Sequence, residues 1–409
     1  MKADIIVIGG GASGMAAAIC AARQGADVLI LERMPRIGKK LLATGNGRCN
    51  YTNEAMGVQY YHSETRQFVA EVLEEFNAED TLAFFADLGI LPKSNQGYVY
   101  PNSMQAASVV DSLRFELERL GVKVMVDIDV SRIHPKGKGF QLESKSETFS
   151  CRRVILACGG RASEKLGSNG SGYQLAKGLG HRIVPVVPAL TGLKAKEAVY
   201  KSLAGVRVEA EIVLHIDGEE RDRHRGEVQL ADYGISGIPV FQVSGRAAYG
   251  LNNRQRVECF LDFFPDTTYD ALVRFLEKRK EHFKSSSLEV FETGLLNRKL
   301  IQVCMKLAGS EKGRLPNIKK LASVMKKFPA SIVGSRGFDF AQVCAGGVDL
   351  KEVSSKNCES KHQPGVYIVG ELLDADGICG GYNLQWAWAT GCLAGTSAGK
   401  ECHDSHRTN

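Results

Sequence analysis

Residues 4–53 read DIIVIGGGASGMAAAICAARQGADVLILERMPRIGKKLLATGNGRCNYTN, and the fold can be worked out from this stretch. Residues 5–8 are all β-branched, which predicts a short buried strand of a parallel sheet. Gly9, Gly11 and Gly14 follow in a GxGxxG spacing, and an alanine-rich helix is expected over 15–23. We expect Gly9 to permit the tight turn, Gly11 to let a pyrophosphate approach, and Gly14 to allow close packing of helix on strand. Free N–H groups at the helix N-terminus would hold the phosphates.

A second strand is predicted at 27–31, and it ends in Glu32, where a carboxylate can accept hydrogen bonds from ribose hydroxyls. Strand, glycines, helix, strand and acid in one run indicate a dinucleotide site. The alternative is that the apolar residues 5–22 form a signal peptide or membrane anchor. We reject it because only Lys2 precedes Asp4, whereas a signal peptide needs a basic leading segment.

The composition is that of a soluble globular protein. The chain has 409 residues, of which 44% are hydrophobic and 24% charged, and it is long enough for two or three domains. No later apolar run approaches the length needed to cross a bilayer, so we expect no membrane association. The eleven cysteines form no CxxC pair, which argues against structural zinc, an iron–sulfur cluster and a disulfide framework. We therefore expect no bound metal, reduced thiols and a cytoplasmic location.

The net charge of +6 is concentrated in one segment. Residues 266–330 contain 14 lysines and arginines against 7 acidic residues. Such a basic face can attract nucleic acid or an anionic substrate, but it is more often the solvated side of a few helices. Because the block lacks the interleaved aromatic residues of nucleic-acid readers, we expect a small-molecule substrate rather than a nucleic-acid partner. The sequence does not indicate an oligomeric state.

The hydrophobic pattern predicts two domains of α/β class. A nucleotide-binding domain is expected from 1–190 and 335–409, with strands such as 122–130 and 154–158 and helices at 64–90 and 106–120. An inserted domain is expected at 191–334, with a β-rich half (191–264) and a helical half (265–334) that begins at a predicted cap near 266.

Later glycine turns suggest further ligand contacts. Gly159 and Gly160 end one buried strand, and Glu371 follows another at 365–370, at the end of the strand where open α/β sheets bind ligands. A final helix is expected at 386–394, whose positive N-terminal end suits an electron-rich group. The glycine-rich loop 167–172 is interpreted as lying near the same ligand. Since no second dinucleotide motif follows, a nicotinamide cofactor would have to bind transiently.

These pieces together resemble the two-dinucleotide-binding-domain flavoproteins, in which the first βαβ unit binds FAD and a C-terminal strand and helix close over the flavin. More closely, the chain is similar to the BaiN/aminoacetone oxidase family, also called YhiN-like flavoproteins, which are FAD-dependent, NAD(P)-linked oxidoreductases. The similarity extends from residue 4 to residue 395. The segments that carry it are RIGKKLL (36–42), TGNGRCNYTN (44–53), AGGVDLKE (345–352), ESK (359–361), GELLDADG (370–377) and GGYNLQWAW (380–388).

The resemblance implies a Rossmann-like FAD-binding domain interrupted by a β-plus-helical insert, with FAD as the cofactor. It assigns the adenosine end of FAD to Glu32 and Arg33, the ribityl chain to Glu371, and the pyrimidine side of the ring to the N-terminus of the last helix, where charge develops on reduction. The positions expected to bind FAD are Gly9, Gly11, Ala12, Ser13, Gly14, Glu32, Arg33, Lys40, Asn46, Gly47, Arg48, Cys49, Asn50, Val130, Gly159, Gly160, Gly347, Gly370, Glu371, Gly381, Tyr382, Asn383 and Leu384.

The resemblance implies two chemistries through flavin N5. One, which we expect here, is NAD(P)H-dependent reduction of a conjugated C=C in a 3-oxo steroid or bile-acid-like substrate. The other is oxidation of a small amine such as aminoacetone by O₂, which would produce peroxide beside the cysteines of the site. A third alternative is a tRNA-modifying or RNA-binding protein, since some FAD proteins of similar architecture act on tRNA.

Candidates for the general acid are Asp232, Tyr233 and Cys49, although each can equally be a turn or cofactor-loop residue. The chain departs from the family pattern here. Ala231-Asp232 stands where relatives commonly carry Thr-His, so a proton-donating role of that histidine does not carry over.

Overall fold

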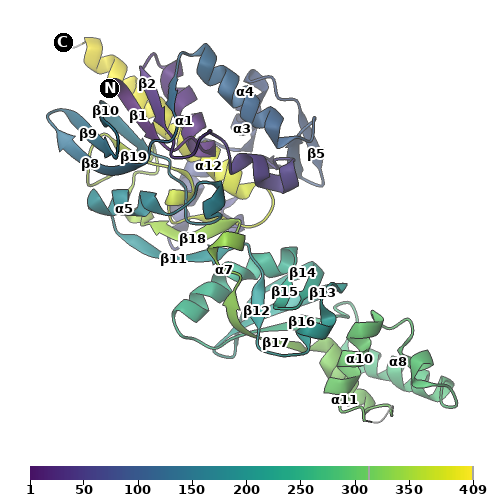
Figure 1. The fold of residues 1–409 in the computed structure, drawn as a ribbon. Coiled ribbons are helices and arrows are strands. Elements are labelled where there is room, and N and C mark those ends of the chain that lie inside the picture. The colour runs from purple at the N-terminus through teal and green to yellow at the C-terminus, as the bar shows by residue number, and fades with distance from the viewer. Residues whose placement is uncertain (312–313, 408–409) are drawn as a thin grey trace. The chain divides into compact units, whose positions relative to one another are not determined.

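The computed structural model describes residues 1–311 and 314–407, which form two compact units (Figure 1). Unit 1 comprises Met1–Val186 and the described residues from Val343 onward, and unit 2 comprises Val187–Gln342. The insert was predicted at 191–334, so unit 2 extends further at both ends. At its far end Arg336 stacks on the rings of Tyr233 and Phe340, at 4.9 and 3.6 Å from their centres, which keeps this segment in unit 2.

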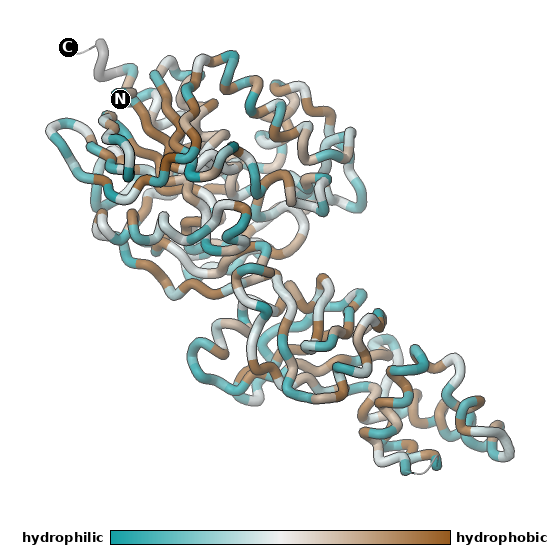
Figure 2. The backbone as a smooth tube through the Cα atoms, viewed as in Figure 1, coloured by the Kyte–Doolittle hydropathy of each residue, from teal (hydrophilic) through white to brown (hydrophobic). Residues whose placement is uncertain are grey.

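A mostly parallel sheet forms the centre of unit 1. Its strands are β1 (Lys2–Ile8), β2 (Val28–Leu31), β7 (Lys123–Met125), β8 (Val130–Lys136), β9 (Gly139–Ser144), β10 (Thr148–Leu156) and β19 (Val366–Ile368). They follow the order β7-β2-β1-β10-β9-β8, and β19 pairs in parallel with the second half of β10. The register places Ile8 opposite both Leu31 and Leu156, so the carboxyl ends of β1, β2 and β10 lie at one edge. The hydropathy colouring shows these inner strands as strongly apolar (Figure 2).

The first and last helices of unit 1, α1 (Ala12–Arg23) and α12 (Tyr382–Arg407), pack directly against each other. A Cβ built on Gly391 would lie 2.5 Å from the backbone oxygen of Ser13, and one on Gly395 would lie 2.1 Å from that of Ala17. Residues four apart share a helix face, so the glycines make a stripe that lets the two backbones approach. The last helix was predicted at 386–394, but α12 extends further at both ends. Towards its C-terminus, Gly399 continues the stripe.

The helix predicted at 64–90 is two helices, α2 (Arg66–Glu75) and α3 (Ala78–Asp87). The break comes at Asn77, whose side chain accepts hydrogen bonds from the backbone N–H groups of Glu79 and Asp80. Asp80 in turn accepts from the N–H of Asn77, which completes a capping box. Local capping chemistry therefore overrides the continuous apolar periodicity.

The remaining elements of unit 1 surround this core. They include β3 (Thr52–Asn53), β4 (Tyr61–His62), β5 (Pro92–Asn95), β6 (Tyr98–Pro101), α4 (Ala106–Arg119), α5 (Ser171–Gly178), β18 (Val343–Val348), η5 (Leu350–Glu352), β20 (Asp376–Gly377) and the first part of β11 (Ile183–Ala189), whose last residues belong to unit 2. Within the described ranges, no helix is both long and apolar enough to span a membrane.

Unit 2 is a closed barrel with helices and a core of its own. Its strands, in the order β12-β15-β14-β13-β16-β17, are β12 (Leu193–Ala195), β15 (Gly234–Ser236), β14 (Glu219–Ala231), β13 (Arg207–Ile216), β16 (Val257–Asp262) and β17 (Phe328–Ser335). Its helices are α6 (Tyr200–Leu203), α7 (Ile238–Asn252), α8 (Tyr269–His282), α9 (Leu288–Glu292), α10 (Arg298–Leu307) and α11 (Ile318–Lys326). Residues 328–334, which were assigned to the helical half, instead belong to the strand β17. Phe328, Ala330 and Ile332 are buried in alternation there, which is a strand period.

Candidate functional site

The predicted phosphate loop lies between β1 and α1 with each glycine in a distinct environment. Gly9 has φ +106°, and a Cβ there would lie 2.4 Å from the backbone oxygen of Ala157. A Cβ on Gly14 would lie 1.9 Å from the backbone oxygen of Gly9, so this glycine permits the close contact of helix and strand. A Cβ on Gly11 would meet nothing within 4 Å. The open space at Gly11, just before Ala12 begins α1, leaves room for a pyrophosphate at the helix N-terminus.

Glu32 follows β2 directly, at the same edge of the sheet. Its carboxylate accepts hydrogen bonds from the backbone N–H groups of Gly10 and Met34, each at 2.7 Å. Burial raises the pKa of Glu32, and the two amide donors oppose that shift. The adjacent Arg33 donates a hydrogen bond to the backbone oxygen of Gly167 at 3.2 Å. The glycine-rich loop 167–172 therefore lies beside the predicted adenosine end, as the sequence interpretation proposed.

A charged cluster brings together residues that are far apart in the sequence. Lys40 Nζ lies 2.7 Å from Glu371 Oε2, and Glu371 Oε1 accepts a hydrogen bond from the backbone N–H of Cys344 at 2.9 Å. A Cβ on Gly160 would lie 2.7 Å from Glu371 Oε1, so a larger residue there would displace the carboxylate. Both charged side chains are mostly buried. The pair fixes one carboxylate where the sheet edge, the Lys40 loop and β18 meet.

The N-terminus of α12 contains the predicted positions Gly381, Tyr382, Asn383 and Leu384. Gly381 has φ +93° and precedes the first helical residue. The Asn383 side chain accepts from the backbone N–H of Gly377 at 2.9 Å and donates to its oxygen at 2.7 Å, so it braces the preceding loop. The Tyr382 hydroxyl donates to a backbone carbonyl 3.1 Å away. Both side chains are therefore engaged within the protein. The groups suited to a ligand here are the unpaired backbone N–H groups of the first helical turn.

The loop after Lys40 is irregular. Asn46 and Gly47 have φ of +53° and +80°, and both are exposed together with Arg48. Cys49 has φ +58° but is fully buried, and burial raises the pKa of its thiol to about 12. Three of the predicted loop positions are thus accessible to a ligand, whereas the Cys49 thiol is held protonated inside unit 1.

Of the other predicted cofactor positions, Gly159 and Gly370 follow the carboxyl ends of β10 and β19, whereas Gly347 lies in β18. Gly159 and Gly370 both have φ +69°, and Gly347 has φ +150°. A Cβ on Gly370 would lie 2.6 Å from Ser13 Oγ, which places this glycine against the phosphate-binding helix. Val130 is buried at the start of β8.

Asp232 and Tyr233, the other catalytic candidates, belong to unit 2. They form the turn between β14 and β15, where Asp232 is exposed and Tyr233 is partly exposed. The Tyr233 ring lies under Arg336, and a Cβ on Gly192 would come within 2.7 Å of the Tyr233 hydroxyl. A catalytic role for either residue stays a prediction.

Sequence reasoning missed Gln385, which anchors the N-terminus of α12. Its Oε1 accepts from the hydroxyls of Thr52 and Thr81 at 2.7 and 2.8 Å. Its Nε2 donates to the backbone oxygens of Phe76 and Asn77 at 3.1 and 2.9 Å. The signal that could have found it is a polar residue alone between Leu384 and Trp386.

FAD fits this arrangement on three structural grounds. Gly11 faces open space where a pyrophosphate would lie, and Glu371 presents a fixed carboxylate toward the middle of the site. The Oδ1 atom of Asn50 is buried without a hydrogen-bond partner and lies 3.0 Å from the position of a Cβ on Gly381. A buried acceptor without a donor is costly unless a ligand supplies one, as the ring N–H of a flavin can.

The family comparison agrees with this geometry. The model of the HI0933-like protein Rossmann domain matches residues 3–397. The chain therefore belongs to the HI0933-like family, and it is an FAD-dependent flavoprotein oxidoreductase. The predicted family and the predicted Rossmann-like fold with an insert are both confirmed.

Relatives with assigned activities align over nearly the whole chain. A 3-dehydro-bile acid delta(4,6)-reductase of Clostridium scindens is 44% identical over 96% of this chain and 98% of its own length. A ribosomal RNA dihydrouridine synthase of Haemophilus influenzae is 27% identical over 97% of this chain and 98% of its own length.

Among solved structures, the 3-ketosteroid delta1-dehydrogenase of Sterolibacterium denitrificans aligns with a TM-score of 0.52. The alignment covers 98% of this chain and all of that one, at 14% sequence identity. This likeness supports the fold assignment.

Proposed function

We propose that this protein is an FAD-dependent reductase that uses NAD(P)H to reduce a conjugated C=C bond in a 3-oxo steroid or bile-acid-like substrate. The main support is the 44% identity to the bile acid reductase, which extends over both chains almost completely. Bound FAD supplies hydride transfer through its N5 atom. The nicotinamide donor would bind only transiently, because the sequence contains a single dinucleotide motif.

The residues of unit 1 would hold and orient the cofactor. The N–H groups that begin α1 would bind the pyrophosphate, and Glu371, fixed by Lys40, would accept from ribityl hydroxyls. The N–H groups that begin α12 would face the pyrimidine side of the ring, where negative charge accumulates on reduction.

Reduction of an enone also requires a proton donor for the carbon that does not receive the hydride. Cys49 is the poorest of the three candidates because its thiol is buried and its pKa is about 12. Asp232 and Tyr233 lie in unit 2, where Asp232 is exposed and Tyr233 is partly exposed, and both stay candidates for the donor. If Tyr233 donates the proton, Tyr233→Phe should lower kcat at least tenfold while flavin reduction by NAD(P)H continues at the original rate.

The reactivity of the cysteine thiols does not distinguish a reductase from an oxidase. Burial raises the pKa of Cys158, Cys344 and Cys379 to about 12 in each case. Protonated thiols react slowly with peroxide, so these residues would tolerate an oxidase better than the sequence argument assumed.

The test is an anaerobic titration of the purified yellow protein, followed through the flavin absorbance. NADH or NADPH is added first, then an unsaturated 3-oxo bile acid. Bleaching by the nicotinamide and stoichiometric reoxidation by the enone are expected. Bleaching by aminoacetone instead, with recovery only in air, would replace this proposal with the amine oxidase. Reduction without reoxidation by any enone would contradict the assigned substrate class.

A second candidate is RNA reduction, because the 27% identical relative is a ribosomal RNA dihydrouridine synthase and making dihydrouridine also reduces a C=C bond. The basic block in unit 2 is the feature that favours it. Some lysines of that block, however, make contacts that stabilise unit 2. Lys326 Nζ donates to the backbone oxygens of Phe264 and Thr267, and Lys327 lies 4.2 Å from the centre of the Phe260 ring.

The discriminating variant for RNA changes the exposed pair Lys319 and Lys320 to glutamate. If RNA is the substrate, this double variant should lose salt-dependent ribosomal RNA binding at least tenfold. A control with the same charge change at Lys138 and Lys145, which are exposed in unit 1, should bind normally. Equal binding by both variants would exclude the basic block as an RNA surface.

A further inference from the structure

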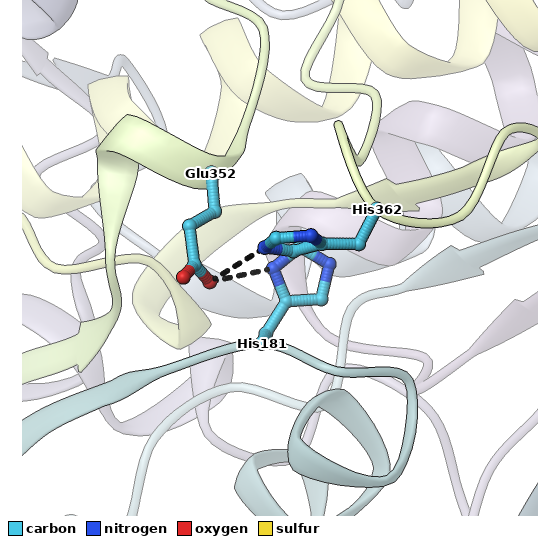
Figure 3. Close-up of side chains that lie close together, drawn as sticks. All are labelled: His181, Glu352 and His362. Carbon is cyan, nitrogen blue, oxygen red and sulfur yellow. Dashed lines mark ion pairs between the residues drawn. The ribbon is translucent and has the colours of Figure 1, made fainter.

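Three side chains from distant parts of the sequence, none of them a predicted FAD-binding position, converge in unit 1 (Figure 3). His181 lies between α5 and β11, Glu352 ends η5, and His362 precedes β19. Glu352 Oε2 is 3.3 Å from His181 Nδ1 and 3.3 Å from His362 Nε2. One donor atom from each residue lies within 4.8 Å of the others, and no second group of this kind occurs among the side chains that the structure describes, in 1–311 and 314–403.

The two nitrogen–oxygen separations match the edge of a tetrahedral metal site. Zinc binds imidazole nitrogen and carboxylate oxygen at about 2.0–2.1 Å, and a tetrahedron of that radius has an edge of about 3.3–3.4 Å. Both measured nitrogen–oxygen separations agree with this edge. Adjacent ligands of an octahedral ion with bonds of about 2.1 Å would be about 3.0 Å apart. The geometry therefore favours a tetrahedral centre.

His181 supplies an independent sign of a missing cation. The residue is 2% exposed, and its Nδ1 has no hydrogen-bond partner although it faces the Glu352 carboxylate. A cation between the nitrogen lone pair and the carboxylate would satisfy both.

Neighbouring groups hold the ligands in place. Ser360 Oγ lies 2.7 Å from His181 Nε2, and because a hydroxyl can donate or accept, it anchors the ring in either tautomer. The backbone N–H of Arg182 donates to Glu352 Oε2 at 2.8 Å. Orienting partners of this kind are characteristic of metal sites in proteins.

We propose that unit 1 binds one divalent transition-metal ion, with Zn²⁺ preferred, through His181 Nδ1, Glu352 Oε2 and His362 Nε2. A water molecule would fill the fourth position, since the His362 side chain is 43% exposed and the site opens to solvent. The ion would join the segment after α5 to the connection between η5 and β19. It is a structural clamp, independent of the function proposed above. The spacing of the cysteines predicted no metal, and these three ligands could not be found in the same way because they are distant in the sequence.

The experiment titrates chelator-treated, FAD-loaded protein with Zn²⁺ alone, by calorimetry and by thermal unfolding followed through tryptophan fluorescence. One Zn²⁺ per chain is expected, with a rise in Tm of about 5 °C at a hundredfold excess over Kd. His362→Gln and Glu352→Gln should each weaken binding at least thirtyfold. Both residues are partly exposed, so the variants should keep their fold, which retained FAD would verify.

The matched control is His134→Gln. His134 makes an exposed pair with Glu143 at 3.6 Å and has no second histidine beside it, so its loss should leave Zn²⁺ binding unchanged. Absence of saturable Zn²⁺ binding would overturn the proposal and leave the cluster as an ion pair. Binding of unchanged strength in both His362→Gln and Glu352→Gln would also overturn it, because the ion would then lie elsewhere, for example at a thiol.

Discussion

Among single residues, Asp374 is a buried carboxyl group whose ionisation lowers the stability of the folded state. It is 9% exposed, and it follows the site carboxylate Glu371 closely in the chain. Burial, with the charges of Asp376 and Asp349, raises the pKa of Asp374 from 3.8 to about 7. The native state therefore binds one more proton than the unfolded state between about pH 4 and pH 7, and stability falls as the pH rises through that window.

We predict that Asp374→Asn makes the protein more stable at pH 8 by about 1–3 kcal/mol, because an amide carries no charge to bury. The gain should shrink toward pH 4, where the native aspartate is already protonated. Urea unfolding at several pH values measures this. Asp111→Asn, at an exposed position of α4, should show no such trend. An Asp374→Asn variant with wild-type pH dependence would mean that Asp374 is not the titrating group.

Gln385 is the residue on which the position of α12 depends most. Its amide satisfies two hydroxyls and two backbone carbonyls in a fully buried location. Gln385→Met keeps the volume but leaves those groups unpaired, so we predict a loss of about 2–4 kcal/mol and weaker retention of FAD. Gln67→Met removes an exposed hydrogen bond to Glu71 and should cost less than about 0.5 kcal/mol. Chemical denaturation and flavin content after gel filtration measure the two effects.

Residues that act through neighbours in the sequence were predictable, and those that act across the fold were not. Gly9, Gly14 and Glu32 follow from a strand–glycine–helix–strand pattern that is contained within one βαβ unit. The pairing of Lys40 with Glu371 spans most of the chain, and nothing local specifies it. A resemblance to relatives supplied Glu371, but the supporting amide of Cys344 came only from the structure.

At the scale of elements, the close packing of α1 on α12 is the contact most sensitive to substitution. Gly395→Ala would place a Cβ 2.1 Å from the backbone oxygen of Ala17, and backbone cannot move aside as a flexible side chain can. We predict a loss of about 1–3 kcal/mol despite the better helix propensity of alanine. Gly178→Ala, in α5, has nothing within 4 Å and should be neutral or stabilising. Equal stabilities of the two variants in urea would show that α12 does not pack as described.

Elements with a strong period were predictable, and elements with mixed signals were missed. The inner strands β1, β2 and β19 are short, apolar and bounded by turns, so their assignment needed no tertiary information. Helix α7 was not predicted because Gly245, Gly250 and several valines lower its helix propensity. The one available signal was Pro239 in its first turn, a position that proline favours.

At the scale of the whole molecule, the chain has two hydrophobic cores, one in each unit. The sequence contains two tryptophans, Trp386 and Trp388, and both lie in the core of unit 1. Tryptophan fluorescence therefore follows unit 1 alone, whereas far-ultraviolet circular dichroism follows both units.

We predict two unfolding transitions, of which FAD raises only the one seen by tryptophan fluorescence, since the predicted cofactor positions belong to unit 1. A hundredfold excess of FAD over Kd should stabilise that transition by about 2.7 kcal/mol. The measurement is a thermal scan with both probes at increasing FAD. Coincident transitions at every FAD concentration would show that the two units unfold as one.

The discontinuity of unit 1 sets an order of events during synthesis on the ribosome. The glycine loop and α1 are made first, but β19 and α12, which complete the sheet and cover α1, are made last. All of unit 2 leaves the exit tunnel before β19 and α12 do, so it can fold first. During that time the small-residue face of α1 remains uncovered. A nascent chain arrested before α12 would therefore contain a folded unit 2 and an incomplete unit 1. We expect the chain to depend on chaperones most strongly at that stage.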